Sequence, residues 1–141
     1  MDKELHLTYE KKLFPQEMVH LFCDLVQSDE TTKKIILFIG KLEKKRTKGE
    51  ETITGITINE IIDNVQVERK TKDEKKHTYK YEITNLHRKT TEQQVAKLLN
   101  MSLLYYESVK PYKMLYLTQR GWQVIAELLH RDKQTKEQGA K

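Results

Sequence analysis

The residues from Thr90 to Leu129 constrain the fold most, because they place a helix, a basic hairpin and a second helix in one uninterrupted run. Thr91 and Gln94 have the Thr-x-x-Gln spacing of a capping box, in which both side chains satisfy backbone N–H groups left free at a helix start. The spacing therefore predicts a helix that begins at about Thr90 or Thr91.

This predicted helix has one apolar face and one polar face. Its apolar residues follow the three- and four-residue spacing of an amphipathic helix, and they are Val95, Leu98 and Leu99. The opposite face carries Gln93, Lys97 and Asn100. We expect the first set to lie in a core and the second set in solvent.

Two short strands and another helix are expected next. Ser102–Val109 and Met114–Thr118 are rich in aliphatic and aromatic residues, and the basic sequence Lys110-Pro111-Tyr112-Lys113 between them predicts a turn. Thr118 is placed to cap a last helix through its hydroxyl. The apolar residues of that helix repeat at three and four, at Trp122, Ile125, Ala126 and Leu129.

The order of these elements resembles the C-terminal half of the winged helix-turn-helix regulators of bacteria and archaea, such as the MarR and PadR groups and the TubR-like plasmid segregation adaptors. In those families the strand after the wing hairpin ends in Leu-Thr-x-x-Gly, a pattern present here as Leu117-Thr118-Gln119-Arg120-Gly121. The resemblance implies an α+β, mostly helical fold. It would be a winged helix-turn-helix with a wing sheet of two to three strands and extra helices at both ends.

The residues before this run predict the remaining elements of such a domain. Pro15–Gln27 fits a helix with proline in its first turn, and Thr32 to about Lys45 fits a second helix with a buried aliphatic stripe. Thr52–Thr57 is predicted to be a short strand, and Thr57 is placed to cap a helix over Ile58–Val65.

Residues 66–89 depart from the family pattern, because a compact helix-turn-helix joins its two helices by about three to four residues. In one interpretation, residues 77–83 pair with residues 66–69 as an extra hairpin that has a lysine-rich tip. In the other, a helical stripe lengthens the recognition helix backward or adds a short helix, and its members are Tyr79, Ile83 and Leu86. β-Branched and aromatic content favours the strand, whereas the spacing favours the helix, so the sequence leaves both open.

The length of 141 residues predicts a single domain. We expect this winged-helix domain to span residues 1–131, followed by a polar tail at 132–141. Its parts would be N-terminal helices at 15–45, the helix-turn-helix and wing at 52–118, and a C-terminal helix at 118–131.

The net charge of +5 and the sequence pI of about 9.1 favour an anionic partner such as nucleic acid. Much of the surplus falls between residues 66 and 90, where eight Lys or Arg face four Asp or Glu. No apolar run approaches the roughly 20 residues that span a bilayer, and no signal-peptide pattern opens the chain. We therefore expect a cytoplasmic, nucleoid-associated protein without a membrane partner.

Nothing in the spacing of reactive residues indicates an enzyme. The five histidines are scattered without metal-ligand spacing, a glycine-rich phosphate loop is missing, and Cys23 is the single cysteine. We expect no catalytic residues, no metal and no cofactor. Cys23 lies in an amphipathic helical pattern and is interpreted as a small buried hydrophobe.

The resemblance also implies a DNA-binding site. B-DNA's major groove admits a helix whose Gln, Asn, Arg and Lys side chains read base edges, while the hairpin contacts the adjacent backbone. The predicted DNA contacts in and before the helix are Arg88, Lys89, Thr90, Thr91, Gln93, Gln94, Lys97 and Asn100. Those in the hairpin are Lys110, Tyr112 and Lys113.

The resulting hypothesis is a sequence-specific double-stranded DNA-binding protein, a dimeric regulator of transcription of bacterial, phage or plasmid type. The terminal helices from Pro15 and Thr118 are the predicted dimer surfaces, because related regulators pair through them. Two alternatives remain open. One is a segregation or replication adaptor that binds DNA and a protein partner, and the other is a winged helix used only for protein contact.

Overall fold

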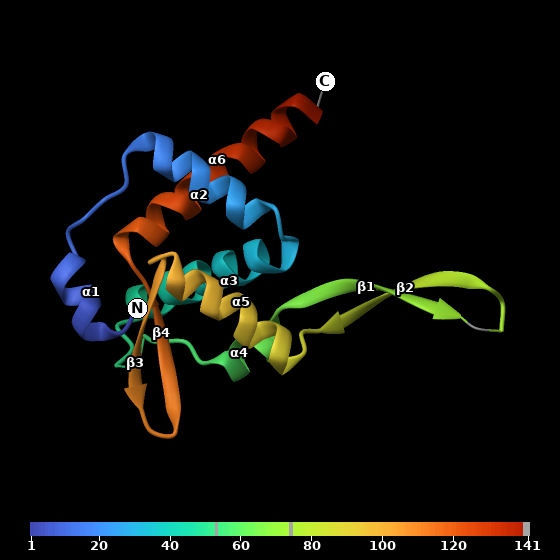
Figure 1. Cartoon of the computed structure of the whole chain (residues 1–141), viewed down its shortest axis with the longest axis horizontal. Coiled ribbons are helices and arrows are strands. Elements are labelled where there is room, and N and C mark those ends of the chain that lie inside the picture. The colour runs from blue at the N-terminus through green and yellow to red at the C-terminus, as the bar shows by residue number, and fades with distance from the viewer. Residues whose placement is uncertain (53, 74, 140–141) are drawn as a thin grey trace.

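The computed structural model describes residues 1–52, 54–73 and 75–139, and over these it has six helices and two antiparallel two-stranded sheets (Figure 1). The α+β, mostly helical class predicted from the sequence is confirmed. In chain order the elements are α1 Lys3–Tyr9, α2 Gln16–Gln27, α3 Glu30–Lys48, α4 Ile58–Asn64, β1 Gln66–Asp73, β2 Thr78–Asn85, α5 Arg88–Asn100, β3 Leu104–Val109, β4 Tyr112–Leu117 and α6 Gln119–Gly139.

The predicted N-terminal helices are present as α2 and α3. Helix α2 begins at Gln16, one residue after the predicted start, with Pro15 at its N-cap position, and it buries Val19, Cys23 and Val26. Helix α3 begins two residues earlier than predicted because the Asp29 carboxylate accepts the N–H groups of Thr31 and Thr32. It also extends beyond the predicted end, to Lys48.

The predicted cap at Thr57 is confirmed, because its hydroxyl accepts the Glu60 N–H at 3.2 Å and α4 follows directly. The predicted strand over residues 52–57 is reduced to a single bridge. In that bridge Ile56 and Leu115 exchange backbone hydrogen bonds of 3.1 and 2.8 Å. Residue 53 lies outside the described residues.

Of the two interpretations of residues 66–89, the hairpin is confirmed and the helical stripe is wrong. Strands β1 and β2 pair over their whole length, from Gln66 opposite Asn85 to Asp73 opposite Thr78. Tyr79 and Ile83 lie on β2 and are exposed, because this hairpin projects away from the helices. Their i, i+4 spacing therefore has no structural meaning here.

The capping box predicted at Thr91 and Gln94 is also wrong, because α5 begins at Arg88 after His87 and makes no side-chain cap. Thr91 lies inside the first turn, where its hydroxyl donates to the carbonyl of His87 at 2.8 Å. The Thr-x-x-Gln spacing reflects two buried positions on one helix face instead.

The turn of hairpin β3–β4 is shorter than predicted, because β4 begins at Tyr112 and only Lys110 and Pro111 lie between the strands. The predicted cap at Thr118 is confirmed, since its hydroxyl accepts the Gly121 N–H at 3.0 Å. Gly121 is required by close packing, because a Cβ atom there would lie 2.3 Å from the Leu103 carbonyl oxygen. Helix α6 then runs to Gly139, so it continues beyond the predicted end at residue 131 into the predicted polar tail, of which residues 140 and 141 lie outside the described residues.

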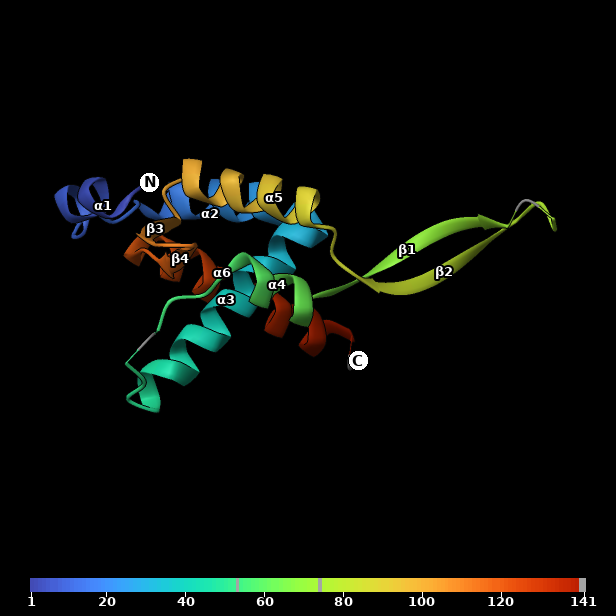
Figure 2. The same cartoon turned by 90° about the horizontal axis from the view of Figure 1, so that it is seen from below.

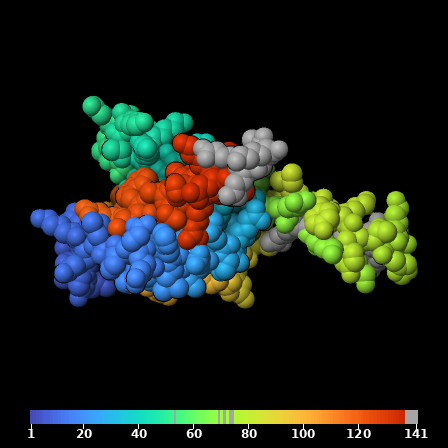
Figure 3. Space-filling model, turned by 90° about the horizontal axis from the view of Figure 1, so that it is seen from above, coloured from blue at the N-terminus to red at the C-terminus, as the bar shows by residue number. Residues whose placement is uncertain are grey.

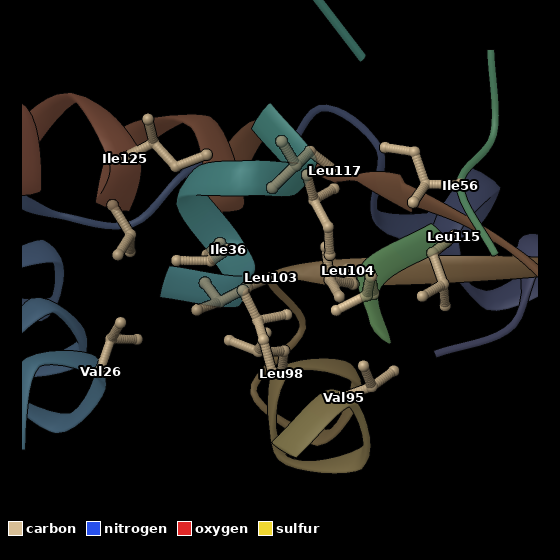
Figure 4. Packing of buried hydrophobic residues seen from close by; sticks show 14 of the residues in the cluster. Val26, Ile36, Ile56, Val95, Leu98, Leu103, Leu104, Leu115, Leu117 and Ile125 are labelled. Atoms are coloured by element: carbon tan, nitrogen blue, oxygen red, sulfur yellow. The ribbon is translucent and has the colours of Figure 1, made fainter. Parts of the chain in front are cut away.

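Helices α2, α3, α4, α5 and α6 and hairpin β3–β4 share one cluster of buried hydrophobic residues among the described positions. Figure 4 shows how its members meet: Val26 from α2, Ile36 from α3, Val95 and Leu98 from α5, Leu104, Leu115 and Leu117 from the hairpin, and Ile125 from α6. Helix α5 lies on one side of this core, and the C-terminal turns of α3 extend to the opposite side (Figure 2). The core therefore fixes α5 with one face free.

Candidate nucleic-acid interface

Helix α5 divides into a buried and an exposed side much as its apolar spacing predicted. Val95 and Leu98 are buried and Leu99 is partly buried against the core. We call the exposed side the outer face of α5, and its residues are Arg88, Lys89, Glu92, Gln93, Ala96, Lys97 and Asn100. Three of these seven side chains are cationic and one is acidic, so the outer face is polar with a positive surplus.

Two residues predicted to contact DNA are removed from the surface. Thr91 is 0% exposed and Gln94 is 8% exposed. The Gln94 side-chain oxygen accepts a buried hydrogen bond of 2.6 Å from the Thr32 hydroxyl of α3. These two side chains position α5 on α3 and contribute nothing to the outer face, and Thr90 beside them is partly buried. Because a cap and a buried pair can share the same spacing, the sequence did not separate the two roles.

Arg88 at the start of α5 is tied to the helix before it. Its guanidinium donates to the Asn59 side-chain oxygen of α4 and lies 3.8 Å from Glu92 one turn further along α5. Both partners are exposed with it, so the ion pair with Glu92 is weak. Arg88 is consequently held at the junction of α4 and α5 with its charge accessible to solvent.

The β3–β4 turn lies next to this junction. A cleft of about 260 Å³ is bounded by the start of α4, the start of α5 and the hairpin, and it is lined by Thr57, Ile58, Asn59, Arg88, Pro111, Tyr112 and Lys113. The structure thus brings together three of the predicted contacts, Arg88, Tyr112 and Lys113, from two segments far apart in sequence. Lys110 is exposed in the turn itself.

Lys113 is oriented along the hairpin and not away from it. Its ammonium lies 4.7 Å from the centre of the Tyr106 ring on the paired strand. This contact holds the charge on one face of the hairpin, because a cation is attracted to the face of an aromatic ring. The ring is partly buried against the core, so the position of Lys113 is set by the packed body of the protein.

The C-terminal end of the outer face lies next to the corner between α2 and α3. Lys97 and Asn100 line a second cleft, of about 380 Å³, with residues of the α2–α3 corner and with Met101. The predicted residues that are exposed on α5 therefore lie along one helix face with two ends. Arg88 faces the β3–β4 hairpin at one end, and Lys97 and Asn100 face the α2–α3 corner at the other.

Sequence reasoning assigned no residue of hairpin β1–β2 to the site, although this hairpin leads directly into α5. Its exposed tyrosines and lysines alternate along the strands, and Lys70 lies 4.2 Å from the centre of the Tyr79 ring. The alternation of aromatic and polar residues from 77 to 83 was the available signal. It favoured a strand without excluding a helix, and it gave no indication that the strand would be far from the core.

Among the described residues, no group of three or more His, Cys, Asp or Glu side chains is arranged to hold a metal ion. No described helix combines the length and the apolar character needed to cross a membrane. No protein-family model, curated protein or solved structure matches this chain.

Proposed function

We propose that this chain is a winged helix-turn-helix protein that binds double-stranded DNA with sequence preference. Three helices, α3, α4 and α5, followed by hairpin β3–β4, have the element order of such a domain. The bridge from Ile56 to Leu115 adds the short first strand to the hairpin. The observation that carries the proposal is the outer face of α5, which is free, polar and net cationic, with a lysine-bearing hairpin beside its first turn.

The dimensions of the elements suit this role. An α-helix with its side chains is about 10–12 Å across, and the major groove of B-DNA is about 12 Å wide. Gln93 and Lys97 are one turn apart at the middle of the outer face, where a bidentate amide would read adenine and an ammonium would read guanine. Lys110 and Lys113 on the hairpin would contact phosphates, which set affinity and salt dependence but not sequence choice.

A dimer is the proposed form, and an apolar stripe on α2 supports it. Met18, Leu21 and Leu25 repeat at three and four on the side of α2 that faces solvent, and Leu129 of α6 is exposed as well. Exposed apolar patches of this kind mark protein contacts. A twofold dimer would place two α5 helices about one turn of DNA apart and would select a repeated half-site. Such a protein would regulate transcription.

The same apolar stripe favours one alternative, an adaptor for segregation or replication that binds DNA and a different protein. Both functions require α5 to bind DNA, and they differ in what covers α2. A winged helix used only for protein contact would instead make no use of the basic residues on the outer face.

The test is a fluorescence-anisotropy titration with random duplex DNA and with the DNA upstream of the protein's own gene, at about 50 and 200 mM salt. We expect preferential binding to the upstream duplex. The double variant Gln93→Ala/Lys97→Ala should weaken that binding by about 10- to 100-fold, the range of one to two base contacts, and should bind random DNA almost as before.

The matched control is Lys44→Ala/Lys48→Ala, two exposed lysines at the end of α3 on the opposite side from α5. This variant should keep the preference for the upstream duplex. Equal loss on both duplexes for Gln93→Ala/Lys97→Ala would contradict the role of α5. The absence of binding to either duplex by the unchanged protein would leave the protein-contact function in its place.

A further inference from the structure

We call hairpin β1–β2, residues 66–85, the arm, because it projects from the body of the protein (Figures 1 and 3). Each of its strands has eight residues, which at about 3.3 Å per residue gives a ribbon roughly 26 Å long. Its base is fixed, because Leu86, which follows β2, is buried in the core and α5 begins two residues later. The direction of the arm is thereby linked to that of α5.

One face of the arm carries large side chains that are exposed to solvent, although Lys70 lies over the Tyr79 ring and Tyr81 lines a cleft with the start of α3. Tyr79, Tyr81 and Ile83 alternate along β2 and are 57%, 66% and 73% exposed. A ribbon of two strands is only marginally stable in water by itself. An exposed row of large side chains on such a ribbon indicates a surface that is completed by a partner.

The same face is cationic. Lys72 is paired with Tyr79 and Lys70 with Tyr81, so both lysines project on the side of the tyrosines, and Lys70 contacts the Tyr79 ring diagonally. The acid paired on this face, Glu68 opposite Ile83, lies near the base of the arm. Lysine ammonium groups and tyrosine hydroxyls are both side-chain groups that contact DNA phosphates, so this face complements a duplex better than it complements an apolar protein surface.

We propose that the arm is a second DNA-binding element, in which Tyr79 and Tyr81, flanked by Lys70 and Lys72, lie against the duplex beside the segment reached by α5. This inference rests on the proposed function, since α5 sets where the arm meets DNA. The major groove admits a two-stranded ribbon as well as a helix. A ribbon roughly 26 Å long would cover about 8 base pairs outside the half-site read by α5.

The experiment is hydroxyl-radical footprinting of the full-length protein on its preferred duplex, together with the dependence of binding on salt. One variant is Lys70→Thr/Lys72→Thr and another is Tyr79→Thr/Tyr81→Thr, because threonine keeps the preference for a strand. We expect both to lose about 8 base pairs of protection on one side of each half-site and to keep the protection by α5. The lysine variant should also reduce the slope of log K against log salt by about 1.8.

The control is again Lys44→Ala/Lys48→Ala, which removes the same charge from the far side and should keep the full footprint. If both arm variants show the footprint and salt slope of the control, the arm does not bind DNA and the proposed function still stands. If the variants instead lose self-association in sedimentation while keeping the footprint, the arm joins copies of the chain and the inference is overturned. If the unchanged protein binds no duplex, the proposed function fails first.

Discussion

The two hairpins of this protein have the same secondary structure and opposite surroundings. In β3–β4, Leu104, Leu115 and Leu117 are buried, and both edges of the hairpin are covered. Ile56 pairs with Leu115 on one edge, and the N-terminal residue accepts the Tyr106 N–H on the other. In β1–β2 no described residue of either strand is fully buried.

The difference shows where the stability of a short antiparallel ribbon comes from. Hairpin β3–β4 packs on α3 and α5, and Tyr105 of β3 stacks on His6 of α1, so tertiary contacts hold it. Beyond its base, hairpin β1–β2 is held by its own cross-strand pairs, which contribute roughly 0.2–1 kcal/mol each. A segment stabilised so weakly can adjust to a partner, as expected for an element that binds a second molecule.

The largest expected difference between the hairpins is in amide hydrogen exchange. Amide hydrogens of β3 and β4 should exchange only when the whole domain unfolds, at a free energy of about 5–15 kcal/mol. Those of β1 and β2 should exchange through local opening, at a free energy close to zero. Exchange followed by NMR in the free protein measures both. Slow exchange in β1 and β2 of the monomer would mean that the arm is stabilised by contacts within the chain.

A matched pair of truncations should separate the hairpins next. Leu115 is 1% exposed, so Leu115→Ala should lower the free energy of unfolding by about 2–5 kcal/mol through lost burial and the cavity it leaves. Ile83 is 73% exposed, and Ile83→Ala should change that free energy by no more than about 0.5 kcal/mol. Urea denaturation followed by circular dichroism measures both variants. Equal losses of unfolding free energy in Leu115→Ala and Ile83→Ala would contradict the proposed difference in packing between the two hairpins.

A smaller effect is a dependence of stability on pH, which should arise from the contact of hairpin β3–β4 with α1. His6 of α1 is buried and stacks on Tyr105 of β3 with ring centres 3.7 Å apart, and burial lowers the pKa of His6 below 6.5. The neutral ring is therefore favoured in the folded state. Stability from this group is complete above pH 6.5 and is lost as the pH falls from 6.5 through the lower folded-state pKa.

The variant His6→Phe keeps an aromatic ring on Tyr105 and should remove this part of the pH dependence of unfolding. Replacing an exposed histidine by His130→Phe is the control and should leave the dependence in place. Amide exchange in the arm should not respond to either change. A pH profile unaltered by His6→Phe would exclude His6 as its source.

The sequence predicted most of the local structure because the signals are local. Thr57 and Thr118 cap the helices that were expected to follow them, and the apolar spacing at Val95 and Leu98 correctly identified the buried side of α5. The exposed residues Gln93, Lys97 and Asn100 followed from the same periodicity. These predictions depend on backbone N–H groups and on the helical repeat, both of which are properties of neighbouring residues.

Only the tertiary structure decided which polar residues are available to a partner. Gln94 is as polar as Gln93, and one is buried against Thr32 while the other faces solvent, because packing of α3 on α5 fixes the rotation of the helix. Likewise, the alternation in residues 77–83 favoured a strand without excluding a helix, but the exposure of Tyr79, Tyr81 and Ile83 is a property of the whole fold. Local sequence signals determined most of the elements, and the contacts between distant elements determined which of their surfaces remained free.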